Sequence, residues 1–415
     1  TTQLNALSGT DVAEFTATQI SALSTAQIAA VTSTGIAALD ATQTAALSTT
    51  QVKALTTTQI RGLDSTDIGQ FTSTQVGVLT SSQLGALTTT NITALDATQV
   101  GALTAAQIGS LSATNLSALD ATQTGALTTT QVAGLTATQL RSMSTTDFGE
   151  LTSTQIGSLS AGQLGALTAT NLASLDATLV GGLSTTQVKG LATTQLSALS
   201  ATDIGEFTST QIGALAANQV GALTANAFSA LDATQVAALS TTQVKGMTTT
   251  QLTGLNVTDI GELSAGQIGA LSPTQLGSLT ATNISALDQT QVAALSVTQV
   301  RGLNATQLRG LDTTDLGELS ATQVGGLTAA QIGALSATSI QSLDNTQIAA
   351  LATTQISALS NSALSALDAT QTASLTTTQV GALTTSQVAN LSATDFGELT
   401  STQIGALSAS QVGAL

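Results

Sequence analysis

Apolar residues occupy two fixed places in every eight residues of this chain. Leucine recurs at every eighth position from Leu7 to Leu415, and the exceptions are Phe15, Val31, Phe71, Met143, Phe207 and Met247. In nearly every copy a Val, Ile or Leu stands three residues before that leucine, directly after a Gln, Asp or Asn. The residue after the leucine is Ser, Thr, Asp or Asn in almost every copy. The chain is therefore an array of octapeptides of the form L-[STD]-x-T-Q-[VI]-[GA]-A.

The spacing of the two apolar rows excludes a one-faced strand and a long helix. The rows are alternately three and five residues apart, so they would fall on opposite faces of a β-strand. In a continuous α-helix the apolar stripe would drift by roughly 80° per repeat, because eight residues turn through about 800°. Neither element gives the chain a lasting apolar face.

A short helix that starts again in every repeat fits the pattern. The motif [STD]-x-x-Q is a capping box, and the leucine before it and the aliphatic after it form a hydrophobic staple. Pro273 follows the cap residue Ser272 and so falls on the first helical position, where proline is tolerated. Gly or Ala near the end of each repeat is expected to end the helix early and to let backbones approach closely.

Helices of this length are stable only when they stack. We therefore expect an all-α solenoid, in which one very short capped helix per repeat forms a continuous superhelix over residues 1–415. A β-solenoid is the alternative, because Thr and Val favour strands.

A longer period lies above the octapeptide. The motif D-[IFL]-G-[EQ] places its Asp at positions 67, 147, 203, 259, 315 and 395, at intervals of seven or ten repeats. Features that recur after three, four, seven or ten repeats would align in stripes on a superhelix of roughly 3.3 to 3.5 repeats per turn. Tandem duplication of a seven-repeat block would leave the same spacing, and the sequence does not separate the two explanations.

The acidic members of this longer period are the candidate metal ligands. They form pairs three residues apart: Asp147 and Glu150, Asp203 and Glu206, Asp259 and Glu262, Asp315 and Glu318, Asp395 and Glu398. Such pairs could hold Ca²⁺, the candidate cofactor, or could contact basic side chains of a neighbouring turn or subunit. The alternative is that Asp replaces Gln in a capping box and Glu only increases solubility. Two carboxylates are few ligands for calcium, and no D-x-D-x-D loop is present.

The basic residues are candidates for subunit assembly. All seven occupy the same repeat position, directly after the core aliphatic, so that this position is expected to face solvent or another chain. Lys189, Lys245 and Arg301 follow one another at intervals of seven repeats, and Arg309 comes one repeat after Arg301. We expect these four residues to form a charged stripe that sets contacts between copies.

Composition excludes several classes of function. The chain has 23 acidic and 7 basic residues and a net charge of −16, which argues against binding nucleic acid. No apolar run reaches the roughly 18 residues of a membrane span, so no membrane insertion is expected. His and Cys are absent, and the repeated carboxylates lack a unique site, so we expect no enzyme.

The sequence begins at Thr1 without Met and ends within a repeat, as expected of a processed chain or part of a longer one.

The run LTTTQVGALTTSQVANLSATD at residues 375–395 resembles the ALTTxQVxAL octapeptide tracts of very large proteobacterial surface or secreted proteins. Such proteins are often labelled adhesins or haem-utilisation proteins. The resemblance covers nearly the whole chain and implies export, an extracellular or cell-surface location and a role as a spacer or fibre. It implies no catalytic residues, and no haem ligand is present, because Met143 and Met247 stand at core leucine positions.

Two functional classes follow. The first is a structural protein that self-associates into an extracellular filament or forms the stalk of a cell-surface adhesin. The second is a binding surface, in which Thr at the second helical position, as at Thr10, Thr18, Thr42 and Thr58, forms a ladder for ice, glycan or mineral. Thr that merely starts a helix is the alternative explanation for that ladder.

Overall fold

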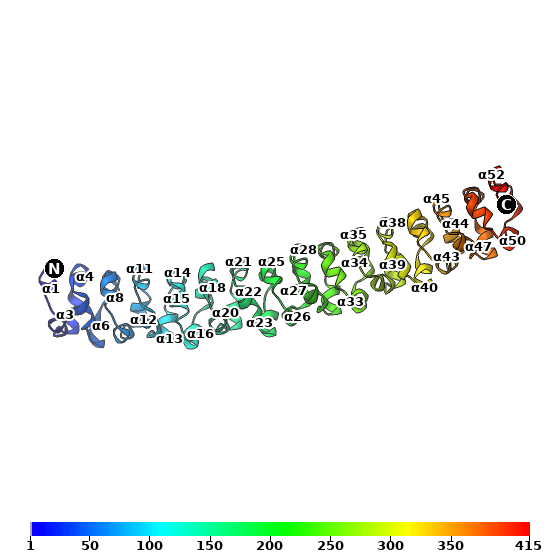
Figure 1. The fold of residues 1–415 in the computed structure, drawn as a ribbon. Coiled ribbons are helices and arrows are strands. Elements are labelled where there is room, and N and C mark those ends of the chain that lie inside the picture. Colours follow the sequence, from blue (N-terminus) through cyan, green and yellow to red (C-terminus); the bar gives the residue numbers. More distant parts are fainter. Residues whose placement is uncertain (1) are drawn as a thin grey trace. The chain divides into compact units, whose positions relative to one another are not determined.

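Short α-helices provide all the regular secondary structure in residues 2–415, the part of the chain that the computed structural model describes (Figure 1). These residues form 52 helices of four to six residues, one in each repeat, and contain no strand. The prediction of an all-α solenoid is confirmed, and the β-solenoid alternative finds no support.

The helices belong to two compact units, divided between Leu199 and Ser200. The first unit runs from α1 (Thr2–Asn5) to α25 (Thr193–Leu196), and the second from α26 (Ala201–Gly205) to α52 (Ala409–Val412). One continuous solenoid over residues 1–415 stays a prediction.

A capping box starts most helices, as the sequence predicts. At α7 (Thr49–Ala54), the Ser48 hydroxyl accepts the Gln51 N–H at 3.2 Å, and Gln51 Oε1 accepts the Ser48 N–H at 2.7 Å. These bonds satisfy main-chain donors that a helix start leaves open. Pro273 is the first residue of α35 (Pro273–Gly277), as predicted.

The helices end without a left-handed residue. No described residue has a positive φ. Many helices end at a C-cap that keeps helical angles, such as Gly62 after α8 (Thr57–Arg61). Where a helix runs up to the repeat leucine, that leucine is the C-cap and is extended; Leu47, after α6 (Ala41–Ala46), has φ −62° and ψ 122°. The extended leucine carries the chain straight into the next cap residue.

Helices three repeats apart pack against each other within each unit. Pairs of this kind include α4 (Thr25–Ala30) with α7 and α36 (Ala281–Ser285) with α39 (Ala305–Gly310). In the second unit α26, α33 (Val257–Glu262) and α40 (Thr313–Glu318) lie along one edge, while α28 (Ala217–Val220) and α35 lie along the opposite edge (Figure 1). Every seventh helix thus returns to the same edge after two turns.

The two apolar rows form the core inside the turns. Val52 and Ile60, which follow the glutamines, are fully buried, and Leu55 at the repeat end is 3% exposed. The cap, the first two helical positions and the residues after the core aliphatic make up most of the surface. That surface consists largely of small polar and small apolar side chains.

Candidate functional site

A glutamine at the third helical position bonds each turn to the preceding one. Gln51 Nε2 donates to the Leu23 carbonyl at 2.8 Å and to the Ile20 carbonyl at 2.9 Å, which lie 28 and 31 residues earlier. Twenty-eight residues are three and a half repeats, in agreement with the predicted pitch. We call such a glutamine, with its two carbonyl acceptors, a Gln rung.

The Gln rung is a function that the capping-box interpretation misses. Capping boxes ordinarily use Glu or Gln at this position, since either accepts the cap N–H. In this chain Glu never occupies it. Only an amide can accept from the cap with its oxygen and donate to the previous turn with its nitrogen. The absence of Glu from the third helical position could have indicated that the side chain there must also donate a hydrogen bond.

Aspartate replaces glutamine in the acidic pairs and at Asp67, and we call these positions Asp rungs. Asp147 keeps the cap, because its Oδ2 accepts the Ser144 N–H at 3.0 Å. An ionised carboxylate has no N–H to donate to the previous turn. Two other Asp rungs, Asp259 and Asp315, instead accept from serine hydroxyls 30 residues earlier, at 2.5 Å each.

The glutamate of each pair follows its Asp by three residues, on the same helix or at its C-cap. Burial raises the pKa of Glu262 above its ordinary value, and the charges of Asp259 and Asp232 raise it further. Asp232 caps α30 (Ala233–Ala237), which packs against α33, so carboxylates from two turns oppose each other there. The pair Asp259 and Glu262 is thus part of a larger like-charged cluster than the sequence alone indicates.

The same arrangement recurs at Glu318. Burial has the largest effect and raises the pKa of Glu318, and the charges of Asp315, Asp288 and Asp312 raise it further. One carboxylate oxygen of Glu318 and one of Glu150 are buried without a hydrogen-bond partner among the described residues. The orphan oxygen of Glu318 lies where neighbouring carboxylates raise the pKa of that group.

The calcium hypothesis gains no third ligand from the structure. Residues 2–415 contain no group of three or more His, Cys, Asp or Glu side chains placed to hold a metal ion. Calcium takes six to eight oxygen ligands, and one oxygen of each Asp already accepts a cap N–H. Calcium binding at Asp203 and Glu206, or at Asp395 and Glu398, stays an untested prediction.

Two of the four assembly candidates bond within the chain. Arg301 Nε donates to the Gly326 carbonyl at 2.5 Å, and Arg309 Nε donates to the Ala334 carbonyl at 3.4 Å. Both acceptors lie 25 residues later, on the next turn. These arginines therefore brace neighbouring turns, which the sequence analysis did not foresee.

Serine and threonine hydroxyls also occur at the repeat position of these arginines, directly after the core aliphatic, and they could have indicated the bonds between turns. Thr253 Oγ1 donates to the Ser278 carbonyl at 3.1 Å, and Ser357 Oγ donates to the Ala382 carbonyl at 2.7 Å, again 25 residues later. Some donor-bearing side chains at this position thus reach the following turn, whereas others, such as Ser197, bond within their own helix. Lys189 and Lys245 are exposed at this position too and remain candidates for contacts between copies.

A family model matches two overlapping segments of the first unit, residues 45–81 and 78–113. The model is that of the ALTTAQ repeat. The chain contains ALTTAQ repeats, as the resemblance in residues 375–395 led us to expect. No curated protein matches the chain. The octapeptide register of the matched ALTTAQ repeats continues without insertion to Leu415.

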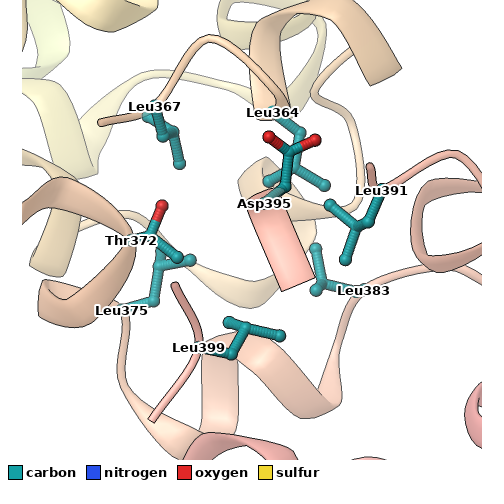
Figure 2. Close-up of a pocket in the computed structure, with 8 residues that line it drawn as sticks. All are labelled: Leu364, Leu367, Thr372, Leu375, Leu383, Leu391, Asp395 and Leu399. Atoms are coloured by element: carbon teal, nitrogen blue, oxygen red, sulfur yellow. The ribbon is translucent and has the colours of Figure 1, made fainter. Parts of the chain in front are cut away.

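Small cavities lie beside two Asp rungs. Leucine side chains and the Asp395 carboxylate surround one of about 10 Å³, where the carboxylate lies near Leu364 and Leu391 (Figure 2). A second, of about 20 Å³, lies beside Asp315. Each has room for about one water molecule, far less than an organic ligand requires.

Burial has the largest effect on Asp395 and raises its pKa, but bonds from Ser392 and Ser365 outweigh it and lower the pKa overall.

The threonine ladder is exposed. Thr10, Thr18, Thr42 and Thr58 all lie on the surface. Consecutive repeats occupy different sides of the superhelix, so neighbouring threonines along the chain face different directions. Any flat row of threonines must therefore join residues of successive turns.

None of the described helices is both long enough and apolar enough to cross a membrane.

Proposed function

We propose that this chain is a structural protein whose stacked turns form the shaft of an extracellular filament or of a cell-surface adhesin stalk. The observation that carries the proposal is the Gln rung. Each such rung bonds one turn to the turn before it, as Gln243 does to Leu215 at 2.8 Å and to Ile212 at 3.0 Å. Repeated bonds of this kind resist bending and stretching within a unit.

The location and the partner rest on the resemblance and on charge. ALTTxQVxAL tracts occur in bacterial surface and secreted proteins, so we propose a bacterial extracellular or cell-surface location. A second copy of this chain is the proposed partner, because exposed basic residues such as Lys245 can meet the acidic clusters of another copy. The proposal includes no catalytic step, no nucleic-acid partner and no membrane insertion.

Microscopy and sedimentation of the purified chain test self-association. We expect negative-stain images to show fibres or bundles that lengthen or thicken as protein concentration rises, and velocity sedimentation to show concentration-dependent growth. Raising the salt concentration should reverse lateral contacts between charged groups. Single particles at every concentration would overturn the filament and leave the stalk as the structural role.

The exposed threonines favour a second candidate, a binding surface for ice, glycan or mineral. Thr42 and Thr58 present a hydroxyl and a methyl group to solvent at the second helical position. A thermal-hysteresis assay tests the ice version, and unchanged crystal shape would exclude it. Glycan arrays and mineral-adsorption assays test the other two versions.

A further inference from the structure

Asp rungs interrupt the bonding between turns. Gln299 donates to the Leu271 carbonyl at 2.8 Å and to the Ile268 carbonyl at 3.2 Å. The equivalent acceptors for Asp315 are the carbonyls of Leu287 and Ile284, and among the described residues no side chain donates to either. Each Asp rung thus replaces two bonds between turns with at most one bond from a serine.

The helix four repeats before each Asp rung is weakened as well, because it carries a short residue instead of glutamine. In chain order these residues are Gly35, Asn115, Asn171, Ala227, Asn283 and Ala363, and they precede Asp67, Asp147, Asp203, Asp259, Asp315 and Asp395 respectively. Asn283 makes a single bond, to the Leu255 carbonyl at 2.8 Å. The glycine and the two alanines have no side-chain donor. At each Asp rung, two successive turns therefore have fewer side-chain hydrogen bonds to the turn before them.

Backbone packing is also open at the Asp rungs. A Cβ added to Gly261, Gly317 or Gly397 would meet nothing within 4 Å. At Gln rungs, a Cβ added to Gly213 or Gly269 would lie 2.9 Å from a carbonyl oxygen of the next turn. Some glycines at Gln rungs are equally open, so open packing accompanies Asp rungs without being confined to them. None of the described Asp rungs has the close approach.

Like charges add repulsion at two of the Asp rungs, Asp259 and Asp315. Glu262 faces Asp232 and Glu318 faces Asp288, in each case across the boundary between two packed turns. Lost bonds and open packing coincide at the Asp rungs, and at Asp259 and Asp315 repulsion is added to them.

We infer that the Asp rungs are seams at which the solenoid opens first, dividing it into segments of seven and ten repeats that unfold one at a time. The six seams lie at Asp67, Asp147, Asp203, Asp259, Asp315 and Asp395. Extension would then be stepwise and would leave the Gln-rung segments folded until each opens in turn. This property goes beyond the proposed structural role and does not require self-association, since it belongs to a single chain.

Pulling a single full-length chain by its ends in an optical trap tests the inference. A residue adds about 3.3–3.6 Å of extended chain, so the seven-repeat and ten-repeat segments should lengthen the chain by about 190 and about 270 Å. We expect the step lengths to cluster at these two values. One cooperative rupture, or step lengths spread evenly over multiples of one repeat, would overturn the inference.

Repairing one seam provides a matched variant. Asn283→Gln with Asp315→Gln would restore donors toward carbonyls of the preceding turns, and the cavity beside Asp315 offers room for the longer side chain. We expect the steps on either side of residue 315 to merge into one. Persistence of both steps in the folded variant would overturn the inference. Asp344→Asn, which keeps a helix cap and touches no Asp rung, is the control and should leave the steps unchanged.

Creating a seam provides the converse test, which does not depend on the repaired variant folding. Gln299→Asp with Gln267→Ala should split the seven-repeat step that ends at residue 315 into two shorter steps. In the unaltered chain, hydrogen exchange should be about tenfold faster in α40, at an Asp rung, than in α38 (Val297–Arg301), at a Gln rung. An unsplit step together with equal exchange rates would overturn the inference.

Discussion

The side-chain nitrogen of Gln243 lies 2.8 Å from the carbonyl oxygen of Leu215, a residue 28 positions earlier. The same glutamine accepts the N–H of its own cap residue, Ser240, at 2.7 Å. Gln243 is 3% exposed, so its bonds are made in the dry interior. One side chain therefore determines both where a helix starts and which turn it packs against.

Gln243→Glu should destabilise the second unit although it preserves the capping motif. A carboxylate accepts the Ser240 N–H but cannot donate to Leu215 or Ile212, and it is buried. We expect a loss of about 1–3 kcal/mol, measured as the shift in urea-induced unfolding. Thr242→Ala changes an exposed neighbour and should shift the transition by less than about 0.5 kcal/mol. Equal effects of the two substitutions would show that the Gln rung contributes little.

Two glycines at equivalent repeat positions should respond to alanine in opposite directions. A Cβ at Gly213 would lie 2.9 Å from the Ala238 carbonyl, so Gly213→Ala must push neighbouring turns apart and should lower the melting temperature. Gly261 has open space at that position, so Gly261→Ala should stabilise its helix by up to about 1 kcal/mol. Thermal unfolding followed by circular dichroism measures both, and stabilisation by Gly213→Ala would contradict the close approach.

Arg301 and Lys245 occupy the same repeat position, seven repeats apart, and should differ in function. Arg301→Met removes the bond to the Gly326 carbonyl and should cost about 0.5–1.5 kcal/mol of stability. Lys245→Glu should leave stability nearly unchanged but weaken association between copies, which sedimentation measures. If Lys245→Glu leaves assembly intact, the basic stripe has no part in it.

Acidification should stabilise the clusters at Glu262 and Glu318. Burial first, and neighbouring carboxylates second, raise the pKa of both groups above the ordinary value of 4.5. A carboxyl with a raised pKa binds protons more tightly in the folded chain, so its stabilising effect is complete below the unfolded value and is lost as pH rises through the folded pKa. We expect the melting temperature to increase as pH falls from 7 to about 4.5.

The double variant Glu262→Gln and Glu318→Gln is the control for this pH dependence. It removes both titrating groups, so the rise in melting temperature on acidification should become smaller. Below about pH 3.8 the trend should reverse, because the pKa values of Asp11 and Asp395 are lowered and their bonds to serines are lost on protonation. An unchanged acid response in the double variant would assign the effect to other carboxylates.

Sequence alone predicted the local structure because local rules determine it. Ser48 and Gln51 form the capping box through bonds that span three residues, and Pro273 confirms the register without any knowledge of packing. The approximate pitch also followed, from recurrences such as the interval between Asp259 and Asp315. These features depend on neighbours in the chain or on simple periodicity.

Contacts between turns were not predicted, because they depend on the separation and offset of the backbones. The sequence placed Arg301 and Arg309 on the surface correctly, but it could not indicate that a carbonyl 25 residues later lies within reach. It likewise gave no sign that Asp232 faces Glu262. No described residue adopts a left-handed conformation, and where a helix runs to the end of its repeat an extended leucine such as Leu47 ends it.

The half-integral pitch of the superhelix affects how such a chain can grow. Because 28 residues are three and a half octapeptides, one turn never contains a whole number of repeats, whereas two turns contain seven. A gene duplication that adds seven repeats lengthens the protein without rotating anything beyond the insertion. Seven repeats are therefore both two whole turns of the superhelix and the unit whose duplication leaves the superhelix in register. Selection that keeps the superhelix in register would also preserve the seven-repeat period in the sequence.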